Sequence, residues 1–234
     1  NKTRILQSAE IATKRLSTVQ KDVVYFKNYS SDTILYMISS SKSKDEFSLN
    51  IRSADKNYLV RTYTSKDTYA IDLSDYGGHN YAFVVSSAGQ TYIYKDILEQ
   101  AKAGPNVSPK PFLSFKQGKN PRASFSTSAR FIAAQSGKSF AVYDAETDRS
   151  YYYDVKYKIG DNGAKWMDGH RLIAVRGNKT IVFDYDGINT QFLSHSFPEI
   201  PSFFNRDYTA LYNIAPSSVS PKKFALSRTE LVVK

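Results

Sequence analysis

A short apolar run that follows a polar turn occurs five times along the chain, at nearly regular intervals. The five runs are DTILYMIS from Asp32, HNYAFVVS from His79, ARFIAAQS from Ala129, HRLIAVRG from His170 and TALYNIAP from Thr209. The intervals are 47, 50, 41 and 39 residues when the equivalent positions are taken as Ile34, Tyr81, Phe131, Leu172 and Leu211. A period of about 40–50 residues is typical of the four-stranded blades of β-propellers.

Each apolar run lies between other strand-like segments. An aromatic-bearing run precedes it, as in VVYFKNY and PRASFST, and a second strand-like run follows, as in FSLNIRS and FAVYDAE. Tyr and Phe, with 18 and 14 copies, favour strands. Hairpin turns that need positive φ are indicated at Ser136-Gly137, Asp168-Gly169, Gly177-Asn178 and Asp186-Gly187. The sequence therefore predicts an all-β fold: a β-propeller of four-stranded blades, with five recognisable here, either complete or part of a seven- or eight-bladed ring.

The expected blades can be placed along the chain. They occupy residues 21–64, 65–112, 113–156, 157–198 and 199–234. Residues 1–20 are either a linker or the outer strand of a preceding blade, although the spacing of their apolar residues also allows a helix. ILEQAKAGPNVSPKPF, residues 97–112, holds a short helix candidate and a Pro-rich connection. The chain begins Asn-Lys-Thr-Arg, which we interpret as the start of a fragment, with any anchor or targeting signal upstream.

Four segments carry a resemblance to known propellers. They are SARFIAAQSGKSFAVYDAETDRSYYY (128–153), AKWMDGHRLIAVRGNKTIVFDYDGIN (164–189), FFNRDYTALYNIAP (203–216) and ALSRTELVV (225–233). The chain resembles the broad WD-repeat and TolB-like propeller group, without the Trp-Asp dipeptide. More narrowly, it is similar to the C-terminal propeller of bacterial PEGA-domain-containing envelope proteins. In that group a membrane anchor and a PEGA module precede the propeller, so the resemblance implies an extracytoplasmic domain anchored through a segment absent from this chain.

The stretch from Lys165 to Asn189 has features of a metal or catalytic site. His170 follows Asp168-Gly169, and Asp184-Tyr185-Asp186-Gly187 is similar to the start of a calcium loop. Such a loop also needs further oxygen ligands and a closing Glu between helices, whereas Phe192 follows here and the flanks read as strands. The sequence therefore favours two hairpin turns, and no metal or other cofactor is expected.

Catalytic groups are also sparse. Carboxylate pairs occur at Asp144/Glu146 and Asp72/Asp75, but enzymatic propellers usually place carboxylates on innermost strands. The innermost strands expected here carry mostly apolar residues, namely Phe26, Ile71, Phe125, Trp166 and Phe204. The chain has no Cys and no Gly-x-Ser-x-Gly or Walker-type loop. We expect no enzyme activity, the alternative being a propeller enzyme that acts on polysaccharide or peptide.

Basic and aromatic residues occur together near the starts of the expected innermost strands. The candidate binding residues are Lys119, Arg122, Lys165, Trp166, Phe203, Phe204 and Arg206. A cation beside an exposed aromatic ring suits an anionic sugar, nucleic acid or peptide; the other interpretation is that the rings pack between blades and the cations are solvated. The net charge of +10 suits an acidic partner, but the Lys and Arg residues are scattered, which disfavours nucleic acid.

The function expected from these features is that of a non-enzymatic binding or scaffold module of a membrane-anchored bacterial envelope protein. Its expected partner is another protein, the missing blades of the same propeller, or an anionic envelope polymer. Contact with a membrane is expected only through the upstream anchor.

Overall fold

The computed structural model describes residues 4–40, 45–64, 67, 69–104, 109–157, 159–160, 162–197, 200, 202–217, 220 and 223–231. Nearly all of these residues with regular structure form antiparallel strands, so the all-β prediction is confirmed. No helix in the described ranges is long and apolar enough to cross a membrane. The chain divides into two compact units, unit 1 (Asn1–Lys116) and unit 2 (Gln117–Lys234), and each is considered by itself.

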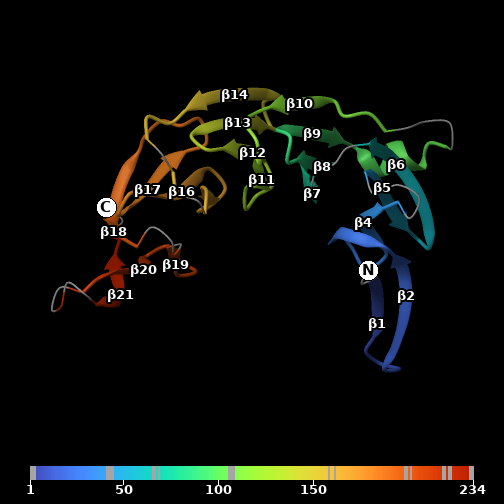
Figure 1. Cartoon of the computed structure of the whole chain (residues 1–234), viewed down its shortest axis with the longest axis horizontal. Coiled ribbons are helices and arrows are strands. Elements are labelled where there is room, and N and C mark those ends of the chain that lie inside the picture. The colour runs from blue at the N-terminus through green and yellow to red at the C-terminus, as the bar shows by residue number, and fades with distance from the viewer. Residues whose placement is uncertain are drawn as a thin grey trace. The chain divides into compact units, whose positions relative to one another are not determined.

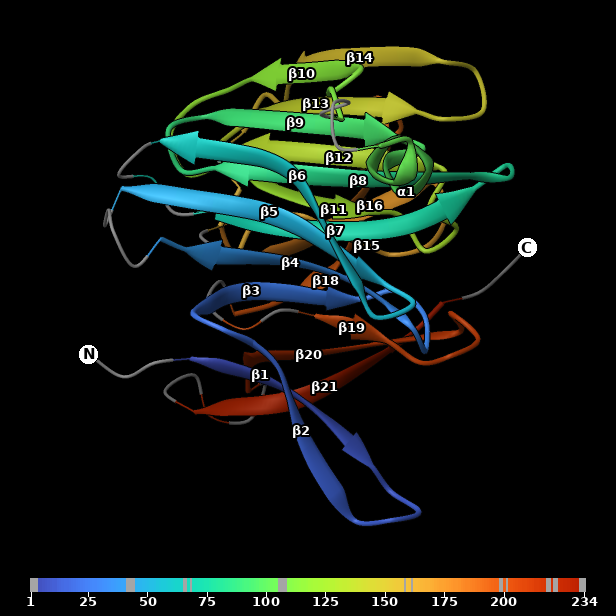
Figure 2. The same ribbon diagram turned by 90° about the vertical axis from the view of Figure 1, so that its right-hand side faces the viewer.

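Unit 1 contains one two-stranded and two four-stranded sheets (Figures 1 and 2). The first sheet pairs β1 (Ile5–Glu10) with β2 (Arg15–Lys21). The second has the order β3-β4-β5-β6, with strands β3 (Val23–Asn28), β4 (Thr33–Ser39), β5 (Glu46–Ser53) and β6 (Lys56–Thr64). The third has the order β10-β9-β8-β7, with strands β7 (Tyr69–Tyr76), β8 (His79–Ser86), β9 (Gln90–Lys95) and β10 (Leu113–Lys116).

The core of unit 1 forms where the two four-stranded sheets pack together. It contains alternating apolar residues of several strands, among them Leu35 and Met37 of β4, Ile71 of β7 and Val84 of β8. The short helix α1 (Ile97–Lys102), expected from the sequence, contacts β6 and β8. Ile97, Leu98 and Ala101 of α1 are buried and extend this core.

The N-terminal segment forms neither a helix nor a single outer strand. In the described part, residues 4–21, β1 and β2 pair antiparallel as a hairpin. Leu6 is buried against Val23 and Tyr36, whereas Ile11 at the turn is 90% exposed. A helix would bury several apolar residues along one face, but in the described part of this segment only Leu6 is buried and only Val19 is half-buried beside it, so the hairpin is favoured.

Unit 2 contains two four-stranded sheets and one three-stranded sheet (Figure 1). The first consists of β11 (Arg122–Phe125), β12 (Phe131–Ser136), β13 (Ser139–Asp144) and β14 (Arg149–Asp154). The second consists of β15 (Lys165–Trp166), β16 (Arg171–Arg176), β17 (Lys179–Asp184) and β18 (Gln191–His195). The third consists of β19 (Phe203–Phe204), β20 (Ala210–Pro216) and β21 (Phe224–Glu230). In each sheet the strands are ordered as in the sequence, which is the up-and-down order of a propeller blade.

Two details differ from the expected blades. Strand β10 pairs with β9 and ends at Lys116, whereas the sequence placed a boundary after residue 112. The sheet of β19, β20 and β21 has three strands in the part of the chain that the structure describes, with β21 at its edge. Both differences concern outer strands, whose apolar pattern is weakest because one edge faces solvent.

Candidate functional site

The Asp-Gly-His segment forms a hairpin turn between β15 and β16. Oδ1 of Asp168 accepts hydrogen bonds from the backbone N–H groups of His170 (2.8 Å) and Arg171 (2.7 Å), and Oδ2 accepts one from Nε of Arg171 (2.7 Å). Burial alone would raise the pKa of Asp168, but these hydrogen bonds hold it below its usual value. Asp168 therefore stabilises the turn, in agreement with the hairpin interpretation.

The Asp184–Gly187 run is the turn after β17. Gly187 has a φ of 86°, and its N–H donates to the carbonyl oxygen of Asp184 at 2.9 Å. Oδ2 of Asp184 accepts a hydrogen bond from Nδ2 of Asn189 at 2.6 Å. The described residues contain no group of three or more His, Cys, Asp and Glu side chains that could hold a metal ion.

The carboxylate pairs noted in the sequence bind neighbouring side chains. Asp144 and Glu146 both form ion pairs with Arg130. Asp72 pairs with Lys27 at 2.8 Å, and Asp75 accepts a hydrogen bond from the Tyr29 hydroxyl at 2.5 Å. These contacts join neighbouring strands or sheets, so they give the carboxylates a structural role.

Five of the seven candidate binding residues line one cavity in unit 2. The cavity has a volume of about 470 Å³ and lies beside β15, β16 and β19. Its described lining residues are Lys165, Trp166, Met167, Ile173, Ser202, Phe203, Phe204, Asn205, Arg206 and Tyr208. We call this cavity the Lys165–Arg206 groove.

Trp166 forms a fixed wall of the groove. Its ring stacks on Phe131 at a centroid distance of 5.9 Å, and its Nε1 donates to the carbonyl oxygen of Ser124 at 3.2 Å. Both contacts are made with the preceding sheet, so Trp166 packs between sheets as well as lining the groove. Its orientation is therefore set before any ligand binds.

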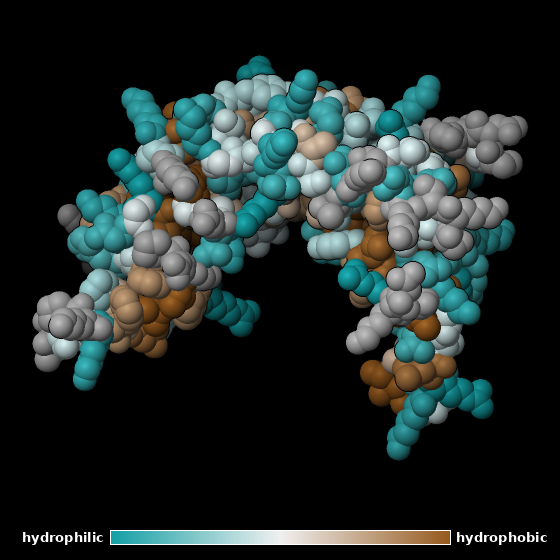
Figure 3. All heavy atoms as spheres, viewed as in Figure 1, coloured by the Kyte–Doolittle hydropathy of each residue, from teal (hydrophilic) through white to brown (hydrophobic). Residues whose placement is uncertain are grey.

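Phe203 and Phe204 take different roles although they are adjacent in β19. Phe204 is half-buried among Met167, Ile173 and Leu211. Phe203 is 58% exposed, and its ring stacks on Tyr212 at 5.4 Å. Figure 3 shows a hydrophobic area over β19 and β20. Phe203 thus presents an apolar ring to solvent at the mouth of the groove.

The groove carries positive charge. Lys165 and Arg206 are exposed, and within the described residues neither forms an ion pair. The described lining contains no Asp or Glu. Two cations beside an exposed ring, without a neutralising carboxylate, suit a ligand that has both anionic and apolar groups.

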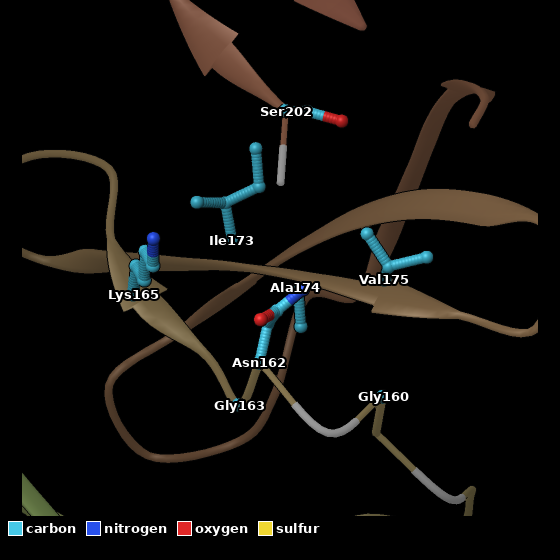
Figure 4. Close-up of a pocket in the computed structure, with 8 residues that line it drawn as sticks. All are labelled: Gly160, Asn162, Gly163, Lys165, Ile173, Ala174, Val175 and Ser202. Carbon is cyan, nitrogen blue, oxygen red and sulfur yellow. The ribbon is translucent and has the colours of Figure 1, made fainter. Parts of the chain in front are cut away.

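A small pocket of about 20 Å³ continues the groove along β16. It shares Lys165, Ile173 and Ser202 with the groove. In Figure 4 the Ile173 side chain points toward Ser202, while Gly160 and Gly163 contribute only backbone. Sequence reasoning missed Ser202 and the two glycines; the Gly160-x-x-Gly163 spacing before β15 is the signal that could have found them.

The other two candidate residues lie outside the groove. Arg122 lines a separate cavity of about 330 Å³, together with Asn120, Gln135 and the loop at Gly160 and Gly163. Lys119 is exposed, and its carbonyl oxygen accepts a hydrogen bond from the Ser136 hydroxyl at 3.0 Å. Lys119 is not among the described lining residues of these cavities.

Comparison of the sequence with family models and with curated proteins finds no match. Solved structures do match. Sqt1 from Chaetomium thermophilum has a TM-score of 0.55 and 11% identity, over 91% of this chain and 61% of its own. A eukaryotic initiation factor has a TM-score of 0.54 and 11% identity, over 91% of this chain and 54% of its own. The C-terminal WD40 domain of Sif2 has a TM-score of 0.51 and 11% identity, over 80% of this chain and 52% of its own.

These likenesses concern the fold alone, because the sequences are so different. The chain spans roughly half to three fifths of the length of these three proteins. The succession of up-and-down antiparallel sheets agrees with them. The chain therefore has a β-propeller fold, as the sequence predicts.

Proposed function

We propose that this chain is a non-enzymatic binding module whose Lys165–Arg206 groove holds an acidic segment of a partner protein. The observation that carries the proposal is that the exposed ring of Phe203 lines the same cavity as two cations, Lys165 and Arg206, and that the described lining has no carboxylate. Carboxylates of the partner would form charge-assisted hydrogen bonds with the cations. An apolar side chain of the partner would cover Phe203.

Two aromatic rings of the groove are held in place by neighbouring residues, which supports a binding role. Trp166 is held by Phe131 and Ser124, and Phe203 is held by Tyr212. A surface whose side chains are already ordered loses less conformational entropy when a partner binds. Less of the favourable interaction free energy is therefore offset by the cost of ordering these side chains.

The wider setting of the module is part of the same proposal. The resemblance to PEGA-domain envelope proteins supports an extracytoplasmic domain of a bacterial envelope protein, anchored in the membrane through a segment outside this chain. The net charge of +10 also suits an anionic envelope polymer. We favour a protein partner because Phe203 offers an apolar contact that a purely anionic polymer would leave uncovered.

Photo-cross-linking in cells tests the proposal. A photoreactive amino acid replaces Phe203 in one variant and Tyr152 in a control variant, because Tyr152 is 64% exposed on the outer strand β14. The proposal expects a protein adduct at position 203, absent at position 152, whose cross-linked peptide is acidic. Identical adducts at both positions, or adducts only with polysaccharide, would contradict it.

A further inference from the structure

The cavity around Arg122 has the features of a second binding site in unit 2. Arg122 is exposed at the start of β11. It forms no ion pair with any residue in the described ranges. The cavity of about 330 Å³ beside it has no Asp or Glu in its described lining, and Asn120 adds a second polar side chain. An unpaired guanidinium in a cavity of this size suits one small anionic group.

The cavity is built by a buried glutamine. Gln135 is 8% exposed and lies opposite Arg122 in the β11–β12 register. Its Nε2 donates to the carbonyl oxygen of Gly137 at 2.9 Å, and its Oε1 accepts from the backbone N–H of Ala164 at 2.7 Å. Gln135 therefore fixes the loop before β15 against the sheet that carries Arg122.

Gly163 allows this loop to approach Arg122. Its φ is 69°, and a Cβ at this position would lie 3.2 Å from Nη1 of Arg122 and 3.1 Å from Oε1 of Gln135. A residue with a side chain at position 163 would come into close contact with the Arg122 guanidinium and fill part of the cavity. The close approach of bare backbone leaves the space in front of Arg122 open.

We propose that the Arg122 cavity binds one carboxylate of an Asp or Glu side chain, carried by the same peptide segment that occupies the Lys165–Arg206 groove. The inference rests on the proposed function and names the ligand more closely: an extended acidic peptide that also bears an aromatic or aliphatic side chain. The planar guanidinium of Arg122 matches a carboxylate in a two-pronged hydrogen bond. Asn120 also lines the cavity, and its amide group can donate a further hydrogen bond.

The lining residues connect the two sites. Gly160 and Gly163 line both the Arg122 cavity and the small pocket, and that pocket shares Lys165 and Ser202 with the groove. The small pocket holds about 20 Å³, which is roughly the room for one water molecule. A pocket of this size holds neither a peptide backbone nor a sugar ring, so a ligand that reaches both sites crosses over its rim. The exposed ring of Phe203 in the groove, which an apolar side chain would cover, is the feature that favours a peptide over an anionic polysaccharide.

The test measures binding of three fluorescent probes to the whole chain: a random copolymer of Glu and Tyr, poly-Glu, and dextran sulfate. Arg122→Gln removes the guanidinium, and its control is Lys138→Gln, which removes an exposed cation that pairs with Asp154 at 3.2 Å. We expect Arg122→Gln to weaken binding of the copolymer by at least about tenfold, because it removes the two-pronged charge-assisted hydrogen bond. Lys138→Gln should leave the affinity unchanged.

A second variant fills the cavity and keeps the charge. Gly163→Ala places a methyl group beside Arg122, and its control is Gly177→Ala, since Gly177 has a similar φ of 56° and nothing within 4 Å of an added Cβ. Both variants place an alanine at a positive φ and so carry similar backbone strain. Circular dichroism should show that both are folded. Only Gly163→Ala should weaken binding of the copolymer.

The outcomes separate this inference from the proposed function. If Arg122→Gln and Gly163→Ala bind the copolymer as tightly as the wild type while Phe203→Ala loses binding, the Arg122 inference is wrong and the proposed function stands. If Phe203→Ala and Lys165→Gln also bind normally, the proposed function is wrong as well. If dextran sulfate binds more tightly than the copolymer and loses affinity in the same variants, the ligand is a polymer and the peptide assignment is overturned.

Discussion

The guanidinium of Arg130 holds the carboxylate of Asp144 through two hydrogen bonds, Nε to Oδ1 at 2.8 Å and Nη2 to Oδ2 at 2.7 Å. The Asp144 side chain is completely buried and also accepts bonds from the Glu146 N–H and the Thr147 hydroxyl. The pair joins the residue before β12 to the last residue of β13. In unit 1, His79 and Asp96 join β8 and the end of β9 in a similar way, with Nδ1 2.9 Å from Oδ2. The contact therefore connects the two central strands of a blade.

Loss of the Arg130 side chain should destabilise unit 2 strongly. Arg130→Gln leaves the Asp144 carboxylate buried without its charge partner, and breaking such a pair costs about 3–5 kcal/mol. Urea unfolding followed by circular dichroism measures the free energy of unfolding. In the control, Lys138→Gln breaks an exposed ion pair with Asp154 and should cost less than about 1 kcal/mol. Equal effects in the two variants would show that the buried pair does not support the blade.

Stability should fall in acid, partly through Asp168. The pKa of Asp168 is lowered in the folded chain, because its hydrogen bonds to the His170 and Arg171 N–H groups and to the Arg171 side chain outweigh the effect of burial. A carboxylate with a lowered folded pKa contributes its full stability above about pH 4, its pKa in the unfolded chain, and loses it as the pH falls through the folded pKa. The free energy of unfolding of Asp168→Asn should therefore depend less on pH below about pH 4. Parallel curves for this variant and the wild type would contradict the assignment.

The turn at Gly187 should not tolerate a side chain. A Cβ at Gly187, where φ is 86°, would lie 2.5 Å from Cδ2 of Tyr153. Gly187→Ala should therefore cost about 1–3 kcal/mol more than Gly177→Ala, since both carry strain from positive φ but only the first overlaps a neighbour. Thermal unfolding of the two variants measures the difference. Equal melting temperatures for Gly187→Ala and Gly177→Ala would contradict the overlap with Tyr153.

The repeat was predictable from the sequence because apolar runs reflect local strand structure. Of the five landmark residues, Tyr81, Phe131, Leu172 and Leu211 are buried, and Ile34 is half-buried. The N-terminal hairpin was not predictable in the same way. The spacing of its apolar residues allowed a helix or a strand, and the choice depends on the contact of Leu6 with residues of β3 and β4.

The candidate site was only partly predictable. Lys165, Phe203 and Arg206 come together because they lie at or beside the first strands of adjacent sheets, which the repeat places side by side. The separation of Arg122 into its own cavity depends on the loop at Gly163, whose φ of 69° has no counterpart in the repeat pattern. The contact of Trp166 with Phe131 depends on packing between sheets, which a single blade sequence does not specify.

Trp166 gives the most direct measurement of binding in the groove. It is the only Trp of the chain and lines the groove, so its fluorescence reports on that site. Titration with a Glu-Ala copolymer, which carries carboxylates and small apolar side chains without aromatic rings, should change the Trp166 emission in a saturable way. The affinity obtained from this titration should fall as the salt concentration increases. Lys165→Gln or Arg206→Gln should lower the affinity about tenfold, whereas Lys138→Gln should leave it unchanged. A Trp166 signal that stays constant, or that all three variants retain equally, would contradict the assignment of the Lys165–Arg206 groove as the binding site.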